Sequence, residues 1–272
     1  MTEHKLPQLF TFDGQARSGK GTAVHAIKRS LQSRNINTML IDAGQVFRVL
    51  VVTAIKHGVD IDLPNAIDEF LSDERMLEET KLEVKRFYHM HHAERDALLY
   101  TQEVGANSAK IGARPGAQAF KDNLLRKWLH DADIEGYKVV LIDGRALQEV
   151  GTMLEAEGLC DYRIGFYFVC DSQMGARRML GYVDRPYETL TDDKKQEVDE
   201  LAEQIVERNR LDSERRVHPI VPPVDAPEFT LPYLDFTPRG RGREMLIVDT
   251  SADMTKQEMT SPIVAVFDKL HI

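Results

Sequence analysis

A glycine-rich stretch near the start of the chain has the residue spacing of a phosphate-binding loop. Gly14 and Gly19 bracket four residues. Lys20, Gly21 and Thr22 follow directly, so the pattern is G-x-x-x-x-G-K-G-T. Glycines let backbone N–H groups curl around phosphate oxygens, the lysine can reach the β- and γ-phosphates, and the hydroxyl can bind Mg²⁺. We therefore predict an ATP phosphate site made by Gly14, Gln15, Ala16, Arg17, Ser18, Gly19, Lys20, Gly21 and Thr22.

The residues on either side of this loop predict the strand and the helix that such a site requires. Leu9–Phe12 is typical of a short buried strand, and Gly21–Arg34 carries apolar residues at helical spacing. A helix that begins at the loop adds the positive end of its dipole to the anion site. The alternative, an ordinary turn with a coincidental lysine, is disfavoured because both the spacing and the context fit phosphate binding.

Two further blocks lie at the ends of predicted strands, where ligands bind in open α/β sheets. Arg48 stands one helical turn after the block DAG at 42–44, and Arg145 ends the block DGR at 143–145. Arginine suits an acceptor phosphate because its guanidinium group matches phosphate oxygens. Asp143 is a candidate Mg²⁺ or water ligand, and a structural cap is an equally open interpretation.

A third arginine set lies in the charged stretch ERNRLDSERR. Arg208 and Asp212 are four residues apart, and Asp212 and Arg215 are three apart, so one helix face presents all three if the helix continues. Such a set could bind an acceptor phosphate, with the aspartate accepting a hydrogen bond from a sugar hydroxyl. A solvated ladder of salt bridges remains equally open, because charged helices often carry one.

Strands and helices alternate through the first and last thirds of the chain, which predicts an α/β fold with a parallel sheet flanked by helices. The middle is ambiguous, since Leu82–Met90 and Leu98–Val104 fit either an antiparallel excursion or further helices. We expect an irregular insertion at Pro222–Arg243. The other predicted strands are 38–41, 139–142, 164–169 and 245–248, and the other predicted helices are 45–57, 66–81, 121–130, 192–210 and 263–270.

The composition is that of a globular protein without a membrane or nucleic-acid partner. The 272 residues include 42% apolar and 29% charged residues, and no apolar run approaches the roughly 20 residues that span a bilayer. The net charge of −9 argues against a nucleic-acid coat or a membrane-surface protein. Cys160 and Cys170 fit buried residues of a reduced, cytoplasmic chain better than a disulfide framework.

The chain resembles the cytidylate kinase family through most of its length. The matching stretches keep the order and the approximate spacing of the family. They are FDGQARSGKGTA, DAGQVFR, YTQEVGANSAKIGARP, LIDGR, ARRML, ERNRLDSERRVHP and IVDTS.

This resemblance implies a three-layer P-loop kinase fold that uses ATP and Mg²⁺ and phosphorylates a nucleoside monophosphate, in a protein that is expected to be a monomer. It implies a single kinase domain with a core at 1–44, 120–176 and 206–272, an acceptor-binding insertion at about 45–119 and a lid at about 177–205. The catalytic residues would be Lys20, Arg145, Arg177, Arg178, Arg208 and Arg215. The metal ion would be held by Thr22 and Asp143. The acceptor would be bound by Gly44, Arg48, Arg145, Arg208, Asp212 and Arg215. Gln118, where the chain departs from the family, is a further candidate for binding the acceptor.

The chain departs from the family where the cytosine base is read. Ala146 stands where the family has an aspartate, and Ala109 and Gln118 stand where it has a serine and an arginine. Ala43 replaces a small hydroxyl residue. Loss of polar groups removes discrimination between bases, so the base is left open. Candidate replacements are Asn107, Ser108, Gln118 and Gln148.

We therefore predict ATP-dependent phosphorylation of a nucleoside monophosphate, with CMP or dCMP as the nearest acceptor. One alternative is a kinase of the same fold that acts on a different phosphorylated acceptor. The other is a nucleotide-binding protein without transfer activity. Four acceptor-side arginines beside a donor loop disfavour the last alternative, because a protein that only binds ATP needs the donor half alone.

Overall fold

The computed structural model describes residues 5–238, 243–270 and 272. The chain divides into two compact units. The first unit consists of Met1–Ile41, Leu129–Glu214 and Pro219–Ile272, and the second consists of Asp42–Trp128 and Arg215–His218. Within the described ranges, no helix is both long enough and apolar enough to cross a membrane.

The described part of the first unit is built on a six-stranded parallel sheet with the strand order β2-β3-β1-β4-β6-β5. This sheet and its flanking helices confirm the predicted α/β fold. Since β1 lies between β3 and β4, the loop that follows β1 stands where the chain connections diverge to the two sides of the sheet. The strands are β1 (Gln8–Gly14), β2 (Thr38–Asp42), β3 (Val139–Asp143), β4 (Asp161–Val169), β5 (Glu228–Thr230) and β6 (Glu244–Asp249).

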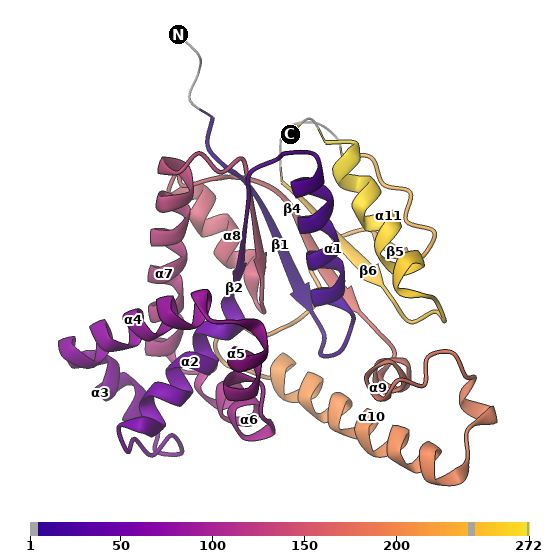
Figure 1. The fold of residues 1–272 in the computed structure, drawn as a ribbon, viewed down its shortest axis with the longest axis horizontal. Helices are drawn as coiled ribbons and strands as arrows, with labels where there is room; N and C mark the ends of the chain where they lie inside the picture. Colours follow the sequence, from indigo (N-terminus) through magenta and orange to yellow (C-terminus); the bar gives the residue numbers. More distant parts are fainter. Residues whose placement is uncertain (1–4, 239–242, 271) are drawn as a thin grey trace. The chain divides into compact units, whose positions relative to one another are not determined.

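Helices cover both faces of this sheet (Figure 1), and α1 and α11 lie side by side on one of them. On the other face, α8 packs against β1 and β4. The helices of this unit are α1 (Lys20–Ser33), α8 (Leu147–Ala156), α9 (Ser172–Leu180), α10 (Asp192–Ser213) and α11 (Lys256–Asp268), with a 3₁₀ turn at Tyr187–Thr189.

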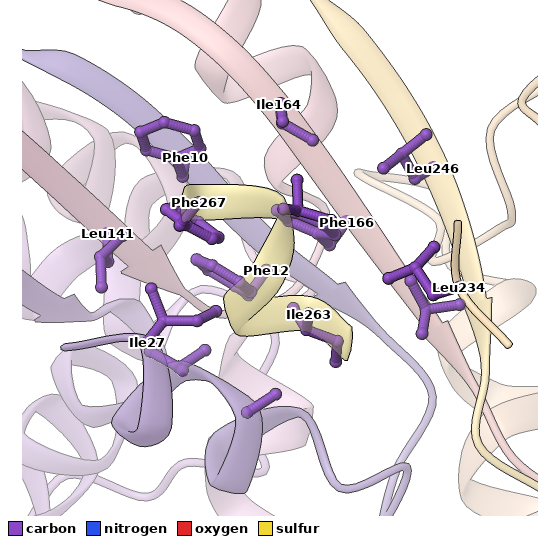
Figure 2. Packing of buried hydrophobic residues seen from close by; sticks show 14 of the residues in the cluster. Phe10, Phe12, Ile27, Leu141, Ile164, Phe166, Leu234, Leu246, Ile263 and Phe267 are labelled. Carbon is purple, nitrogen blue, oxygen red and sulfur yellow. The ribbon is translucent and has the colours of Figure 1, made fainter. Parts of the chain in front are cut away.

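Successive side chains of β1 point to opposite faces of the sheet, and they are buried on both faces. Phe10 and Phe12 point to the α1 and α11 side, where Figure 2 shows them packed with residues of β4 and α11. The rings of Phe12 and Phe166 are stacked with centroids 5.1 Å apart. Thr11 points the other way and bonds the Tyr162 hydroxyl, with 2.6 Å between the oxygens. Both faces of β1 are therefore fixed by packing, which holds the loop at its carboxyl end.

The second unit is helical in its described residues and has its own apolar core. The segments that fitted either an antiparallel excursion or helices are helical. The predicted helix 66–81 is broken at Asp73, whose carboxylate accepts hydrogen bonds from Arg75 and Met76 and begins a new helix. The helices are α2 (Ala43–Lys56), α3 (Ala66–Ser72), α4 (Glu74–His89), α5 (His92–Leu99), α6 (Gln102–Ile111) and the first part of α7 (Pro115–Ile134).

Three other expectations need correction. Helix α10 ends at Ser213, so Arg215 does not continue the helix face of Arg208 and Asp212. The expected irregular insertion contains strand β5, which pairs with β6. The last helix begins at Lys256, not at 263, because Thr255 and Glu258 form a capping box at its start. Positions 239–242 of the expected insertion lie outside the described residues.

Candidate active site

The loop at 14–22, called the phosphate loop below, follows β1 and leads into α1. Its glycines are required by geometry, because Gly14 has φ 129° and a Cβ atom there would lie 2.1 Å from the Phe168 carbonyl oxygen. Gly19 has φ 79°, and its Cβ atom would lie 2.8 Å from the Met259 sulfur. The backbone of the loop can therefore follow this path only without side chains at these two positions.

Hydrogen bonds from neighbouring strands and helices fix the phosphate loop. The Gln15 amide donates to the Phe168 carbonyl at 2.9 Å, and the Ala16 amide donates to Asn209 Oδ1 at 2.9 Å. The Thr250 hydroxyl donates to the Ser18 carbonyl at 2.9 Å. Helix α1 begins at Lys20 without a side-chain cap, and the first N–H groups of a helix have no partner within it. These donors fit the phosphates of ATP.

Lys20 and Asp143, which were predicted separately, lie together in the first unit. The Lys20 ammonium group forms an ion pair with the Asp143 carboxylate and donates to the Gly144 carbonyl at 2.8 Å. Thr22 lies on the first turn of α1 with its side chain exposed. Within the described residues there is no cluster of three His, Cys, Asp or Glu side chains that could hold a metal ion. Mg²⁺ would fit here with Thr22 and Asp143 as oxygen ligands, since it commonly takes its other ligands from phosphates and water.

Asp13 joins the phosphate loop to the turn that carries Arg145, and the sequence analysis did not identify it. Its carboxylate accepts hydrogen bonds from the Gly14 amide and from the Leu147 amide, both at 2.7 Å. The pKa of Asp13 is raised by burial, while these hydrogen bonds act in the opposite direction. The turn also contains Ala146 in the left-handed conformation, with φ 54°. One buried carboxylate thus connects the start of the phosphate loop to the residue that follows the turn between β3 and α8.

The first unit brings three of the predicted acceptor residues together. Arg145 forms an ion pair with Asp212, which is 3% exposed. Arg208 Nε lies 4.0 Å from the same carboxylate, one helical turn away on α10. The two guanidinium groups are therefore held beside each other by one buried aspartate, and Lys20 contacts the two residues directly before Arg145.

Arg177 and Arg178 lie in the last turn of α9 and are bound to backbone groups. Arg177 is buried, donates to the Val183 carbonyl at 3.3 Å and to the Arg185 carbonyl, and pairs with the Asp253 carboxylate. Arg178 donates to the Ala252 carbonyl at 2.9 Å and to the Thr250 hydroxyl at 3.4 Å. The predicted lid arginines thus hold the segment after α9 and the turn after β6, and this turn also contacts the phosphate loop through Thr250.

In the second unit, Arg48 lies among residues at the start of α2 and the end of α5. Its guanidinium group donates to the Leu99 carbonyl at 2.9 Å and lies 4.5 Å from the centre of the Tyr100 ring. The Tyr100 hydroxyl donates to Asp42 at 2.9 Å. Burial and the Asp42 carboxylate raise the pKa of Tyr100, so the hydroxyl keeps its proton. Gly44 lies on the same first turn of α2, where a Cβ atom would be 3.2 Å from the Asp42 carboxylate.

Gln118 and Arg215, also predicted to bind the acceptor, contact α6 and its C-terminal end. The Gln118 side chain donates to the Gly112 carbonyl and accepts from Lys121 at 2.8 Å, so both ends of its amide are engaged. Arg215 donates to the Ala109 carbonyl at 3.5 Å, and burial lowers its pKa. Gln118 therefore stabilises the turn between α6 and α7 in this structure.

Comparisons with known proteins show which family the chain belongs to. Residues 10–231 match the family model described as cytidylate kinase. The cytidylate kinases of Yersinia pestis (strain Pestoides F) and Yersinia pseudotuberculosis (serotype O:1b) are each 28% identical to the chain over 225 residues, which cover 81% of this chain and 85% of theirs. A crystal structure of a protein from Chloroflexus aurantiacus aligns over 98% of both chains, with 12% sequence identity and a TM-score of 0.37.

Proposed function

We propose that this chain, which belongs to the cytidylate kinase family, transfers the γ-phosphoryl group of ATP to a nucleoside monophosphate. CMP and dCMP are the nearest acceptors. The observation that carries this proposal is the contact of Lys20 with Asp143 and Gly144, the residues directly before Arg145. A lysine suited to the donor phosphates thus lies near an arginine suited to the acceptor phosphate, and this supports a transfer reaction, because simple ATP binding does not require the arginine.

For phosphoryl transfer, the protein must position the donor and acceptor phosphates and neutralise the charge of the transferring group. The amides of the phosphate loop would hold the donor phosphates, and Lys20 would move from Asp143 to the β- and γ-oxygens as ATP binds. A bound Mg²⁺, held through Thr22 and Asp143, would supply charge neutralisation on the phosphates. The release of Asp143 by Lys20 would free its carboxylate for this role.

The arginines have proposed roles on the acceptor and on the transferring group. In the first unit, Arg145 and Arg208 would bind the acceptor phosphate while Asp212 keeps their orientation and accepts from a sugar hydroxyl. In the second unit, Arg48 and Arg215 would bind the acceptor. Arg177 and Arg178 would begin a lid at about 177–205, and the acceptor-binding insertion would span about 45–119.

The choice of base requires a separate explanation. Ala146 and Ala109 present only methyl groups, and the Gln118 amide is engaged at both ends within the second unit. These three positions therefore offer no free polar group to cytosine. This observation favours a second candidate function, a kinase of the same fold with an acceptor other than CMP.

The test is ADP release from ATP and Mg²⁺ with a panel of CMP, dCMP, UMP, AMP, GMP and dTMP. Turnover confined to CMP and dCMP would support cytidylate kinase activity with base contacts at other positions. Turnover with another member would identify a changed base pocket. No turnover with any member, with ATP still bound, would overturn the proposal in favour of a different acceptor or a protein that only binds nucleotides.

A further inference from the structure

Gln45, on the first turn of α2, has a buried side-chain amide nitrogen that has no hydrogen-bond partner in the described part of the chain. The residue is 3% exposed, and its Nε2 atom is covered and bonds to nothing in the described part of the chain. Its backbone amide, in contrast, donates to Asp42 at 3.0 Å. The side chain of Gln45 is therefore the feature that needs an explanation.

Burying an amide nitrogen without a hydrogen-bond partner is unfavourable, because the nitrogen loses its hydrogen bonds to water and gains none in the protein. Buried polar side chains are nearly always paired, so an exception points to a missing partner. Helix α2 satisfies its other buried polar group in the usual way, since the Thr53 hydroxyl donates to the Val49 carbonyl at 2.9 Å. A leucine of similar size at position 45 would avoid the unfavourable burial, which suggests that the amide serves a ligand.

The position of Gln45 indicates which ligand this is. It lies one helical turn before Arg48, and residues three apart share a face of a helix. Asp42, which caps α2 and binds the Tyr100 hydroxyl, lies three residues before it. Gln45 thus belongs to the group of residues proposed to bind the acceptor.

We propose that Gln45 reads the acceptor base, with Nε2 donating a hydrogen bond to a carbonyl oxygen of a pyrimidine. This inference rests on the proposed kinase function and supplies, within the second unit, a polar group for the base that the methyl group of Ala109 cannot offer. Because Nε2 is covered in this structure, the groups around it must move when the acceptor binds. The amide nitrogen is a donor only, so it pairs with a carbonyl oxygen and not with an exocyclic amino group.

Two opposite effects distinguish this role from a structural one. Gln45→Leu should leave the melting temperature of the ligand-free protein unchanged or raise it, because a buried amide without a partner is removed. The same substitution should raise the KM for CMP about tenfold, the effect expected for one lost hydrogen bond, and leave the KM for ATP within about twofold. A structural glutamine would show a lower melting temperature and an unchanged KM for CMP.

The experiment compares the wild type, Gln45→Leu and the matched control Thr53→Val, all in the full chain. Thr53→Val removes a satisfied buried hydroxyl from the same helix, so it should lower the melting temperature and leave both KM values unchanged. Gln45→Glu is the second variant if Gln45→Leu does not fold, since it keeps the size of the side chain and replaces the donor with an acceptor. It should also raise the KM for CMP and UMP.

The outcomes separate this inference from the proposed function. If the wild type phosphorylates pyrimidine monophosphates and both Gln45 variants keep its KM for them, the inference is overturned and the kinase function stands. If the wild type phosphorylates AMP in preference to CMP and UMP, the pyrimidine assignment is wrong. If it phosphorylates no monophosphate, the function and the inference fail together.

Discussion

Replacing Thr250 with valine should weaken ATP use, because the Thr250 hydroxyl ties the turn after β6 to the phosphate loop. This hydroxyl is fully buried, lies 2.9 Å from the Ser18 carbonyl and 3.1 Å from the Val169 carbonyl, and accepts from Arg178 at 3.4 Å. Valine has nearly the same shape and no polar atom. The substitution therefore removes hydrogen bonds without opening a cavity.

The expected magnitude follows from these contacts. Leaving a buried group without its hydrogen-bond partner costs about 1–3 kcal/mol, and the Ser18 carbonyl loses its Thr250 donor. About 2 kcal/mol corresponds to a change of roughly 30-fold in an equilibrium constant. We expect the KM for ATP to rise about ten- to thirtyfold, while the KM for the acceptor changes less than about threefold. Thr250→Ser, which keeps the hydroxyl, should stay within about threefold of the wild type on both substrates.

The assay is steady-state ADP release with ATP varied at saturating acceptor, together with urea unfolding of the ligand-free variants. The free energy of unfolding reports how much of the lost interaction stabilised the fold, and the KM for ATP reports how much positioned the loop. Equal KM values for Thr250→Val and Thr250→Ser would refute the argument that this hydroxyl positions the phosphate loop.

Four other substitutions test the site. Lys20→Ala should lower kcat by about 10³-fold, which corresponds to about 4 kcal/mol of transition-state stabilisation. Its melting temperature should stay near that of the wild type. Undiminished ADP release would show that Lys20 has no role in the transfer. Arg48→Ala and Arg208→Ala should each raise the KM for the acceptor about a hundredfold, since each would remove a proposed charged contact with the acceptor phosphate. Initial rates with each substrate varied measure this effect, and equal losses toward ATP would mean that both are misassigned. Gly14→Ala should destabilise the protein by about 3 kcal/mol or more, because its Cβ atom would collide with the Phe168 carbonyl; an unchanged urea midpoint would contradict this close approach.

The features that the sequence predicts correctly depend on residues close together along the chain. Leu9, Phe10 and Phe12 lie within one short stretch of mostly apolar residues, and this local pattern predicted the buried strand that the structure has. In the second unit, Leu82–Met90 and Leu98–Val104 were ambiguous, because short apolar stretches fit strands and helices alike. The roles of the predicted site residues, Lys20 included, stay predictions until the substitutions are measured.

The features that the sequence missed depend on contacts between distant segments. Asp13 accepts from Leu147, 134 residues away, and Thr250 donates to Ser18, 232 residues away. Residue spacing along the sequence does not predict hydrogen bonds between such distant residues, because only the tertiary fold brings them together. The engagement of Gln118 by a backbone carbonyl is likewise invisible in the sequence, where a glutamine near an expected base pocket suggests recognition.

The double attachment of Asp13 has a thermodynamic consequence for the order in which substrates bind. The same carboxylate holds the Gly14 amide of the phosphate loop and the Leu147 amide beyond Arg145. If ATP displaces the loop, these two hydrogen bonds would transmit the displacement to the turn that bears Arg145. Coupling between two binding events is reciprocal, so if ATP improves the affinity of this turn for a phosphate, the phosphate improves the affinity for ATP by the same factor. Asp13 would then make the binding of the two substrates cooperative, whichever substrate arrives first.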